Sequence, residues 1–225
     1  MTWILTNDDG IDAPGLEALA AAVTEPVIIV APQTHQSGCG HQVTTTRPIA
    51  VEQRTPHSFA VDGTPADCVR LALSQLCPAV SLVLSGINAG ANLGVDSYIS
   101  GTVAAVREAA FHRIPGIAFS QYRQGNRPID WQRSRDWTTE VLQKLLSLPL
   151  APDRFWNVNL PHLLPGDPDP EIVFCSPCTC PLPIDYRRDG AAYHYAGRYA
   201  DRQRVAGTDV EVCFAGAIAV TQICL

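Results

Sequence analysis

Short apolar runs alternate with longer amphipathic stretches through the first two-thirds of the chain. The apolar runs that are typical of buried strands lie at residues 3–6, 27–31, 81–84 and 116–120. The stretches with helical periodicity lie at residues 13–23, 64–76, 100–113 and 131–148. This alternation predicts an α/β fold with a mostly parallel sheet and helices on both of its faces.

The pattern changes in two other parts of the chain. Residues 42–53 alternate polar and apolar positions around Pro48, which predicts an edge strand or a hairpin insertion. Strands are expected at 155–160 and 171–175, and a closing strand or strand pair at 211–222. Tyr193, Tyr195 and Tyr199 with Gly190 and Gly197 indicate a protruding β-hairpin at about residues 184–208. We expect one domain over 1–225, with its core in 1–160 and a β-rich part in 161–225.

Composition indicates a globular protein. The 225 residues are 46% hydrophobic and 17% charged, unlike a disordered chain. No stretch approaches the ~20 apolar residues needed to cross a bilayer. The N-terminus has no basic segment before an apolar run, as a signal peptide would. We therefore expect a cytoplasmic protein with no membrane partner.

The charge balance disfavours a nucleic-acid partner. The net charge is -6 and Lys144 is the only lysine, whereas duplex binding needs several clustered cations. A local group of arginines indicates a solvated basic face, or a surface that steers an anionic substrate. The group consists of Arg187, Arg188, Arg198, Arg202 and Arg204.

Eight cysteines are many for a cytosolic chain. Cys175, Cys178 and Cys180 form a C-x-x-C-x-C run, but no second Cys/His pair follows to complete a zinc site. A soft-metal site is therefore disfavoured, and the role of this run is left open. The other cysteines that we expect to be small core residues are Cys68, Cys77, Cys213 and Cys224.

Asp8 and Asp9 follow the first apolar run and lead directly into Gly10. They would lie at the carboxyl end of the first strand, where open α/β sheets bind their ligands. Two adjacent carboxylates repel each other, so the pair needs a cation or a shared proton. Oxygen ligands without softer neighbours favour Mg²⁺, Mn²⁺ or Ca²⁺ over Zn²⁺. The alternative is a simple turn with solvated carboxylates.

Two further loops follow predicted strands. Residues 85–94 are rich in glycine and asparagine, and Asn88 and Asn92 offer neutral carbonyl oxygens to a hard cation. In the loop 32–41, Ser37 could offer a hydroxyl to a metal or substrate. His41 could assist proton transfer, although a lone loop histidine is typical of a surface. Cys39 as a nucleophile is disfavoured, because the sequence assigns it no partner.

Ser100, Gly101 and Thr102 stand at the start of a predicted helix. Free backbone N–H groups and the helix dipole favour phosphate there, and the two hydroxyls add donors. Ser100 could equally be a simple N-cap. The chain has no G-x-x-x-x-G-K-[ST] sequence, so a phosphate would be held by N–H groups, hydroxyls, arginine or metal.

Several short motifs stand in a fixed order along nearly the whole chain. They are Asn7-Asp8-Asp9-Gly10, Ala13-Pro14-Gly15, Ala31-Pro32, Ser37-Gly38, Gly63-Thr64-Pro65-Ala66-Asp67-Cys68, residues 85–94, Ser100-Gly101-Thr102-Val103, Asn157-Val158-Asn159 and Gly207-Thr208-Asp209. As an ordered set, these motifs resemble those of the SurE-type survival protein nucleotidases. Three features depart from the family pattern: Ile99 directly before Ser100, with Tyr98 one place earlier; the run Arg107-Glu108-Ala109; and an end at Leu225.

The resemblance implies a three-layer α/β/α Rossmann-like fold with an extended C-terminal hairpin that is used in dimers or tetramers. It also implies a phosphomonoesterase that hydrolyses nucleoside 5′- and 3′-monophosphates with one divalent metal ion, Mg²⁺ or Mn²⁺. The implied metal ligands are Asp8, Asp9, Ser37 and Asn88. The residues implied around the phosphate are Asn92, Ser100, Gly101 and Thr102.

For the chemistry, we expect attack by a water that Asp9 helps to orient, with Asp8 and Asp9 as catalytic residues. The alternative is an aspartyl-phosphate on Asp8, which is disfavoured because Asp8 is not part of the expected D-x-D arrangement. A nucleotide- or phosphate-binding regulatory module without turnover is the rival function. A dinucleotide-dependent oxidoreductase ranks last, because no G-x-G-x-x-G follows the first strand.

Overall fold

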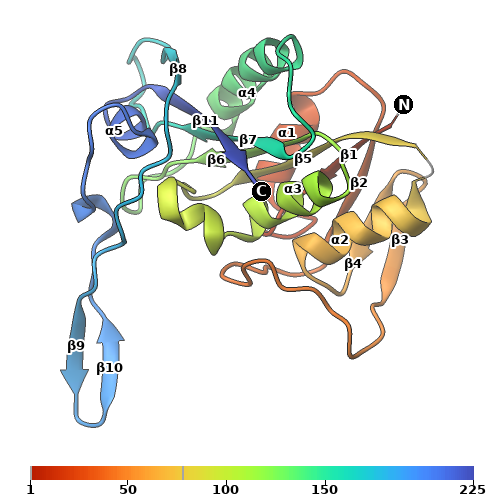
Figure 1. The fold of residues 1–225 in the computed structure, drawn as a ribbon, viewed down its shortest axis with the longest axis horizontal. Helices are drawn as coiled ribbons and strands as arrows, with labels where there is room; N and C mark the ends of the chain where they lie inside the picture. Colours follow the sequence, from red (N-terminus) through yellow and green to blue (C-terminus); the bar gives the residue numbers. More distant parts are fainter. Residues whose placement is uncertain (1, 78) are drawn as a thin grey trace.

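The computed structural model describes residues 2–77 and 79–225, and its main feature is a mixed sheet covered on both faces (Figure 1). Within the described residues the sheet has nine strands in the order β3-β4-β2-β1-β5-β6-β7-β11-β8. The strands are β1 (Thr2–Thr6), β2 (Val27–Pro32), β3 (Val51–Thr55), β4 (Ser58–Val61), β5 (Val80–Asn88), β6 (Gly116–Gln121), β7 (Arg154–Leu160), β8 (Ile172–Phe174) and β11 (Ile218–Cys224). The helices are α1 (Pro14–Ala21), α2 (Pro65–Leu71), α3 (Gly101–Phe111), α4 (Trp131–Leu146) and α5 (Asp209–Phe214).

The six strands from β4 to β7 along the sheet run parallel, and the edges depart from this pattern. β3 pairs antiparallel with β4, and β11 pairs antiparallel with β7. Helices α1 and α4 cover one face, and α2 and α3 cover the other. The α/β prediction is therefore confirmed, and the carboxyl ends of β1, β2 and β5 meet at one edge.

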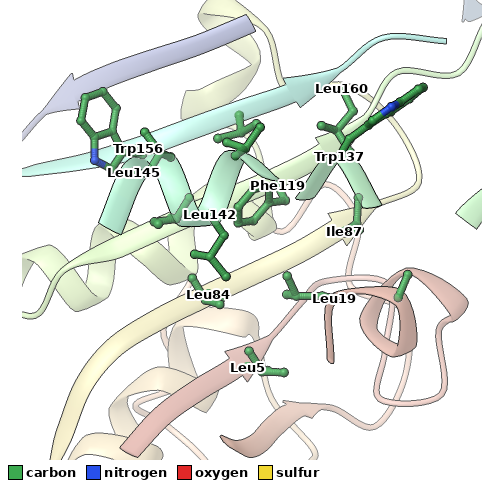
Figure 2. Packing of buried hydrophobic residues seen from close by; sticks show 14 of the residues in the cluster. Leu5, Leu19, Leu84, Ile87, Phe119, Trp137, Leu142, Leu145, Trp156 and Leu160 are labelled. Atoms are coloured by element: carbon green, nitrogen blue, oxygen red, sulfur yellow. The ribbon is translucent and has the colours of Figure 1, made fainter. Parts of the chain in front are cut away.

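The face under α4 shows how the apolar runs become a core. Figure 2 shows Leu142 and Trp137 of α4 above Phe119 of β6 and Leu84 of β5. Phe119 and Leu84 are fully buried. Burying one such side chain stabilises the fold by about 1.5–3 kcal/mol, so these positions hold α4 on the sheet.

Several helices begin where the sequence supplies an N-terminal signal. Thr64 and Asp67 form a reciprocal capping box at α2, and Pro65 occupies its first position. Asp130 accepts hydrogen bonds from the amides of Gln132 and Arg133 at the start of α4. α2 continues into a π-helical turn, Ala72–Leu76.

The C-terminal hairpin consists of β9 (Tyr186–Asp189) and β10 (Ala192–Tyr195), and it projects away from the sheet (Figure 1). Tyr199 does not belong to it. That residue begins a 3-10 turn, Tyr199–Asp201, and packs against the core cluster of Leu93 and Val210. No helix among residues 2–77 and 79–225 is both long and apolar enough to span a membrane.

Three further sequence predictions are wrong. Residues 211–222 are not a strand throughout, because α5 occupies the first part and β11 begins at Ile218. The first turn of α5 carries Asp209 and Glu211, and the helix dipole favours acidic side chains at that end. Arg202 does not belong to a solvated basic face, because its side chain is 1% exposed against Asp96. Cys224 is exposed at the end of β11 and is not a core residue.

The segment 42–53 is only partly as predicted. β3 is indeed an edge strand in a hairpin, but it spans Val51–Thr55, and its partner β4 was not predicted. Residues 42–50 have no regular strand; Thr44 there binds Asp67 through its hydroxyl and its amide.

Candidate active site

The turn after β1 fixes the two adjacent carboxylates. The side-chain amide of Asn7 donates to the Gly10 carbonyl at 2.8 Å, and the Gly10 amide donates back to Asn7 Oδ1 at 3.3 Å. Gly10 has φ +106°, which favours glycine. This closed turn places Asp8 against α3 and Asp9 against the end of β5.

Asp8 is buried at the start of α3, with 4% of its surface exposed. The Thr102 hydroxyl donates to Asp8 Oδ1 at 2.5 Å. A Cβ on Gly101 would lie 2.9 Å from Asp8 Cβ, so the helix start needs glycine to lie this close. Burial raises the pKa of Asp8; the Thr102 hydrogen bond opposes this rise and the charge of Asp9 adds to it.

No lysine or arginine within the described residues forms an ion pair with Asp8. A buried carboxylate without a cationic partner is costly, and a bound cation would relieve that cost.

Asp9 is half-buried and links two loops. Its Oδ2 accepts a hydrogen bond from the Ala89 amide at 3.0 Å, just beyond β5. Its Oδ1 lies 3.3 Å from His35 Nδ1, in the loop after β2. The carboxyl ends of β1, β2 and β5 therefore meet around this carboxylate.

Asn88 is the last residue of β5, and its Nδ2 donates to the Gly90 carbonyl at 2.7 Å. That bond leaves the side-chain carbonyl oxygen as an available ligand. Ser37 is exposed in the loop after β2. The neighbouring Gln36 amide donates to the Asp8 carbonyl at 2.7 Å, which fastens this loop beside β1.

The four residues predicted around a phosphate lie in two different places. Ser100, Gly101 and Thr102 begin α3, and Ser100 Oγ accepts from the Val103 amide at 3.1 Å as an N-cap. Asn92 lies in the second place, where its side-chain amide donates to Ser120 Oγ at 2.8 Å. Its backbone carbonyl accepts from Asn157 Nδ2 at 2.8 Å, so Asn92 ties its loop to β6 and β7.

His41, in the loop after β2, contacts α3 through Glu108 and not the pair Asp8 and Asp9. Its Nε2 lies 2.8 Å from Glu108 Oε2, and Arg70 and His112 contact the other oxygen of Glu108 at 2.9 and 3.1 Å. Burial alone would raise the pKa of Glu108, but the bonds from His41, His112 and Arg70 lower it. His41 thus anchors the Ser37 loop to α3.

Cys39 lies close to Asp8 and Gly101, but its chemistry is that of a neutral thiol. Burial, and then the charge of Asp8, raise the pKa of Cys39 to about 11. Since the thiolate is the nucleophile, this environment disfavours Cys39 in that role.

Sequence reasoning missed a buried network that holds the loop between Asn88 and Ser100. Arg202 Nη1 donates to Asp96 Oδ2 at 2.6 Å, and the Tyr199 hydroxyl donates to the same oxygen at 2.5 Å. Asp209 accepts from the amides of Gly94 at 2.6 Å and Cys178 at 2.8 Å. The Gly207-Thr208-Asp209 motif was the available signal for this contact.

The donor set at the carboxylate pair fits a hard divalent cation. Asp8 and Asp9 could supply charged oxygens to such an ion, and Asn88 and Ser37 could supply neutral ones, which are the ligands that Mg²⁺ and Mn²⁺ prefer. Within the described part of the chain, no group of three or more His, Cys, Asp or Glu side chains is arranged to hold a metal. The run Cys175, Cys178 and Cys180 accordingly forms no such group.

Comparison with known proteins relates the chain to one family over most of its length. The family model described as "Survival protein SurE" matches residues 3–179. A Nostoc sp. protein is 61% identical over 224 residues, which are 99% of each chain. The protein named 5′-nucleotidase SurE of Paramagnetospirillum magneticum is 40% identical over 98% of this chain and 88% of its own. The crystal structure of the SurE protein from Aquifex aeolicus matches with a TM-score of 0.87 at 32% identity, covering 100% of this chain and 93% of that one.

Proposed function

The chain belongs to the SurE family, and on this premise we propose that it is a divalent-metal-dependent phosphomonoesterase acting on nucleoside 5′- and 3′-monophosphates. Its relatives named 5′-nucleotidase SurE make it a hydrolase of the 5′-nucleotidase class. The observation that carries the proposal is Asp8: a buried carboxylate, without a cationic partner among the described residues, that contacts the N-terminus of α3.

The start of α3 supplies the phosphate subsite in this proposal. The first N–H groups of a helix have no partner within it, and the dipole is positive at this end. Ser100 Oγ already satisfies the Val103 amide, so the earlier amides, those of Gly101 and Thr102, are the ones that would bind the phosphate. These donors would stabilise negative charge on the phosphoryl oxygens without any lysine.

Asp8, Asp9, Asn88 and Ser37 would hold the cation. A divalent cation bound there would polarise a phosphoryl oxygen and lower the pKa of a water. The Thr102 hydroxyl favours the charged form of Asp8 by donating to it. Asp9, fixed by the Ala89 amide, would orient the attacking water. We prefer attack by water over an aspartyl-phosphate, because Asp8 is not part of the D-x-D arrangement expected for that mechanism.

The test is phosphate release from AMP with Mn²⁺ or Mg²⁺, with and without EDTA. We expect EDTA, Asp8→Asn and Asp9→Asn each to abolish release. Asp62→Asn is the matched control, since this exposed carboxylate pairs with Arg47 and is not one of the proposed site residues. Hydrolysis that survives both EDTA and the Asp8→Asn change would refute the proposal. Tight AMP binding without release, across several metals, would favour the regulatory module instead.

We also propose that the chain forms a homodimer or homotetramer through its C-terminal hairpin. Ile184 is 85% exposed, and Tyr186, Tyr193 and Tyr195 are also exposed there. Such a contiguous group of exposed apolar side chains is typical of an interaction surface. Light scattering tests this: Tyr193→Ser with Ile184→Ser should lower the mass, and a monomeric parent chain would contradict it.

A further inference from the structure

A cavity of about 360 Å³ opens beside Asp9, on the face of the sheet that carries α1 and α4. Its lining includes Asp9, Gly15, His35, Ala89 and Trp131. The phosphate-ready start of α3 lies on the other face, where it contacts Asp8. The two carboxylates therefore stand between a phosphate subsite and an open cavity.

Trp131 supplies an aromatic wall to this cavity. It is the first residue of α4, and its side chain is half-buried. A Cβ on Gly15 would lie 3.1 Å from Trp131 Cη2 and 1.9 Å from the Ile87 carbonyl oxygen. Because residue 15 is glycine, the indole packs closely over the start of α1. One wall of the cavity is thus formed by the aromatic side chain of Trp131, while Asp9 and His35 add polar groups.

Building on the proposed function, we propose that this cavity binds the nucleoside of the substrate and that the nucleobase stacks on Trp131. When the phosphate lies at α3 and the ester bond lies beside Asp9, the leaving group must occupy space that adjoins Asp9. This cavity adjoins it directly. A nucleobase has an extended π face, and stacking on an aromatic side chain tolerates any base. Recognition here would therefore distinguish nucleotides from other phosphomonoesters more than one base from another.

Two other cavities fit the nucleoside less well. One of about 340 Å³ is lined by Ala89, Tyr122, Arg123 and Tyr199 among others, but by neither Asp8 nor Asp9. Its Tyr199 hydroxyl is already engaged with Asp96. Another of about 240 Å³, lined by Trp137 and His162, lies at the ends of β6 and β7 and shares none of the predicted site residues.

The experiment compares AMP with ribose 5-phosphate, which has the same ester but no base. The readout is the ratio of the two kcat/KM values. Trp131→Leu should lower this ratio roughly tenfold, the loss of one base–aromatic stack, and Trp131→Phe should retain most of it. Arg123→Ala, in the neighbouring cavity, is the control and should leave the ratio unchanged. An unchanged ratio in Trp131→Leu, or a selective loss in Arg123→Ala, would overturn the proposal.

Binding provides a readout that needs neither metal nor turnover. Adenosine should quench tryptophan fluorescence in the parent chain, and Trp131→Phe should remove most of that quenching although the other three tryptophans remain. Quenching that persists in Trp131→Phe would overturn the subsite. If no phosphate is released from AMP but quenching depends on Trp131, the proposed function fails and the nucleoside site stands. If release is normal and both Trp131 tests are negative, only the nucleoside site fails.

Discussion

Replacing Arg202 with Met should destabilise the fold far more than removal of an exposed arginine. The side chains of Arg202 and Asp96 are 1% and 7% exposed. Besides the ion pair at 2.6 Å, Arg202 Nη2 donates to the Leu93 carbonyl at 3.1 Å. The substitution leaves a buried carboxylate without its cation and a backbone carbonyl without its donor.

The expected loss in the free energy of unfolding depends on which hydrogen bonds Asp96 keeps in Arg202→Met. Breaking a buried ion pair by removing one partner costs about 3–5 kcal/mol. The Tyr199 hydroxyl and the Leu93 amide still donate to Asp96 Oδ2, which favours the lower end. We therefore expect a loss of about 3 kcal/mol, a large share of the roughly 5–15 kcal/mol typical of a whole protein.

Urea denaturation measures this loss. Arg47→Met is the matched control, because the Arg47–Asp62 pair is 48% and 56% exposed and should contribute less than about 1 kcal/mol. The double variant Asp96→Leu with Arg202→Met should be more stable than Arg202→Met alone, since no buried charge is left unpaired. If Arg202→Met costs no more than Arg47→Met, the reasoning from burial is wrong.

In Glu108→Gln, the free energy of unfolding should fall less steeply with decreasing pH than in the parent chain. The pKa of Glu108 is lowered from 4.5, so its carboxylate stabilises the fold above that value, and this contribution is lost as pH falls below it; urea titrations from pH 6 to pH 3 measure the difference. Gly15→Ala should cost about 1–3 kcal/mol by thermal denaturation, because the new Cβ would overlap the Ile87 carbonyl. Asp8→Asn should weaken Mn²⁺ binding at least tenfold by calorimetry, because it removes a charged ligand, and an unchanged affinity would contradict its role.

The parallel strands at the centre of the sheet could be predicted from the sequence, because buried parallel strands are continuous apolar runs. Prediction failed where elements are short. β4 has four residues and α5 has six, too few for either period to be visible. The strand predicted across 211–222 shows this: Val210, Val212 and Cys213 are buried on a helix, although their pattern also suits a strand.

The sequence predicted the location of those site residues that stand at the end of a parallel strand. Asp8 and Asp9 follow β1 closely and Asn88 ends β5, so parallel topology alone brings them to one edge. The sequence did not show that Asn92 would use its amide on Ser120, or that His41 would bind Glu108, 67 residues away. Such pairings depend on which segments the fold brings together, and no local pattern encodes them.

The C-terminal segment supports the candidate site although it does not enter it. The loop from Asn88 to Ser100 carries a predicted metal ligand at one end and the start of α3 at the other. Its middle is anchored by the buried side chain of Leu93, and Arg202 and Asp209 also hold Leu93, Gly94 and Asp96 through buried polar bonds. Buried polar groups are costly when a partner is missing, so we expect this loop to be ordered only when the C-terminal segment is folded against it. The apolar pattern thus builds the sheet, while these distant polar bonds set the spacing between Asn88 and α3.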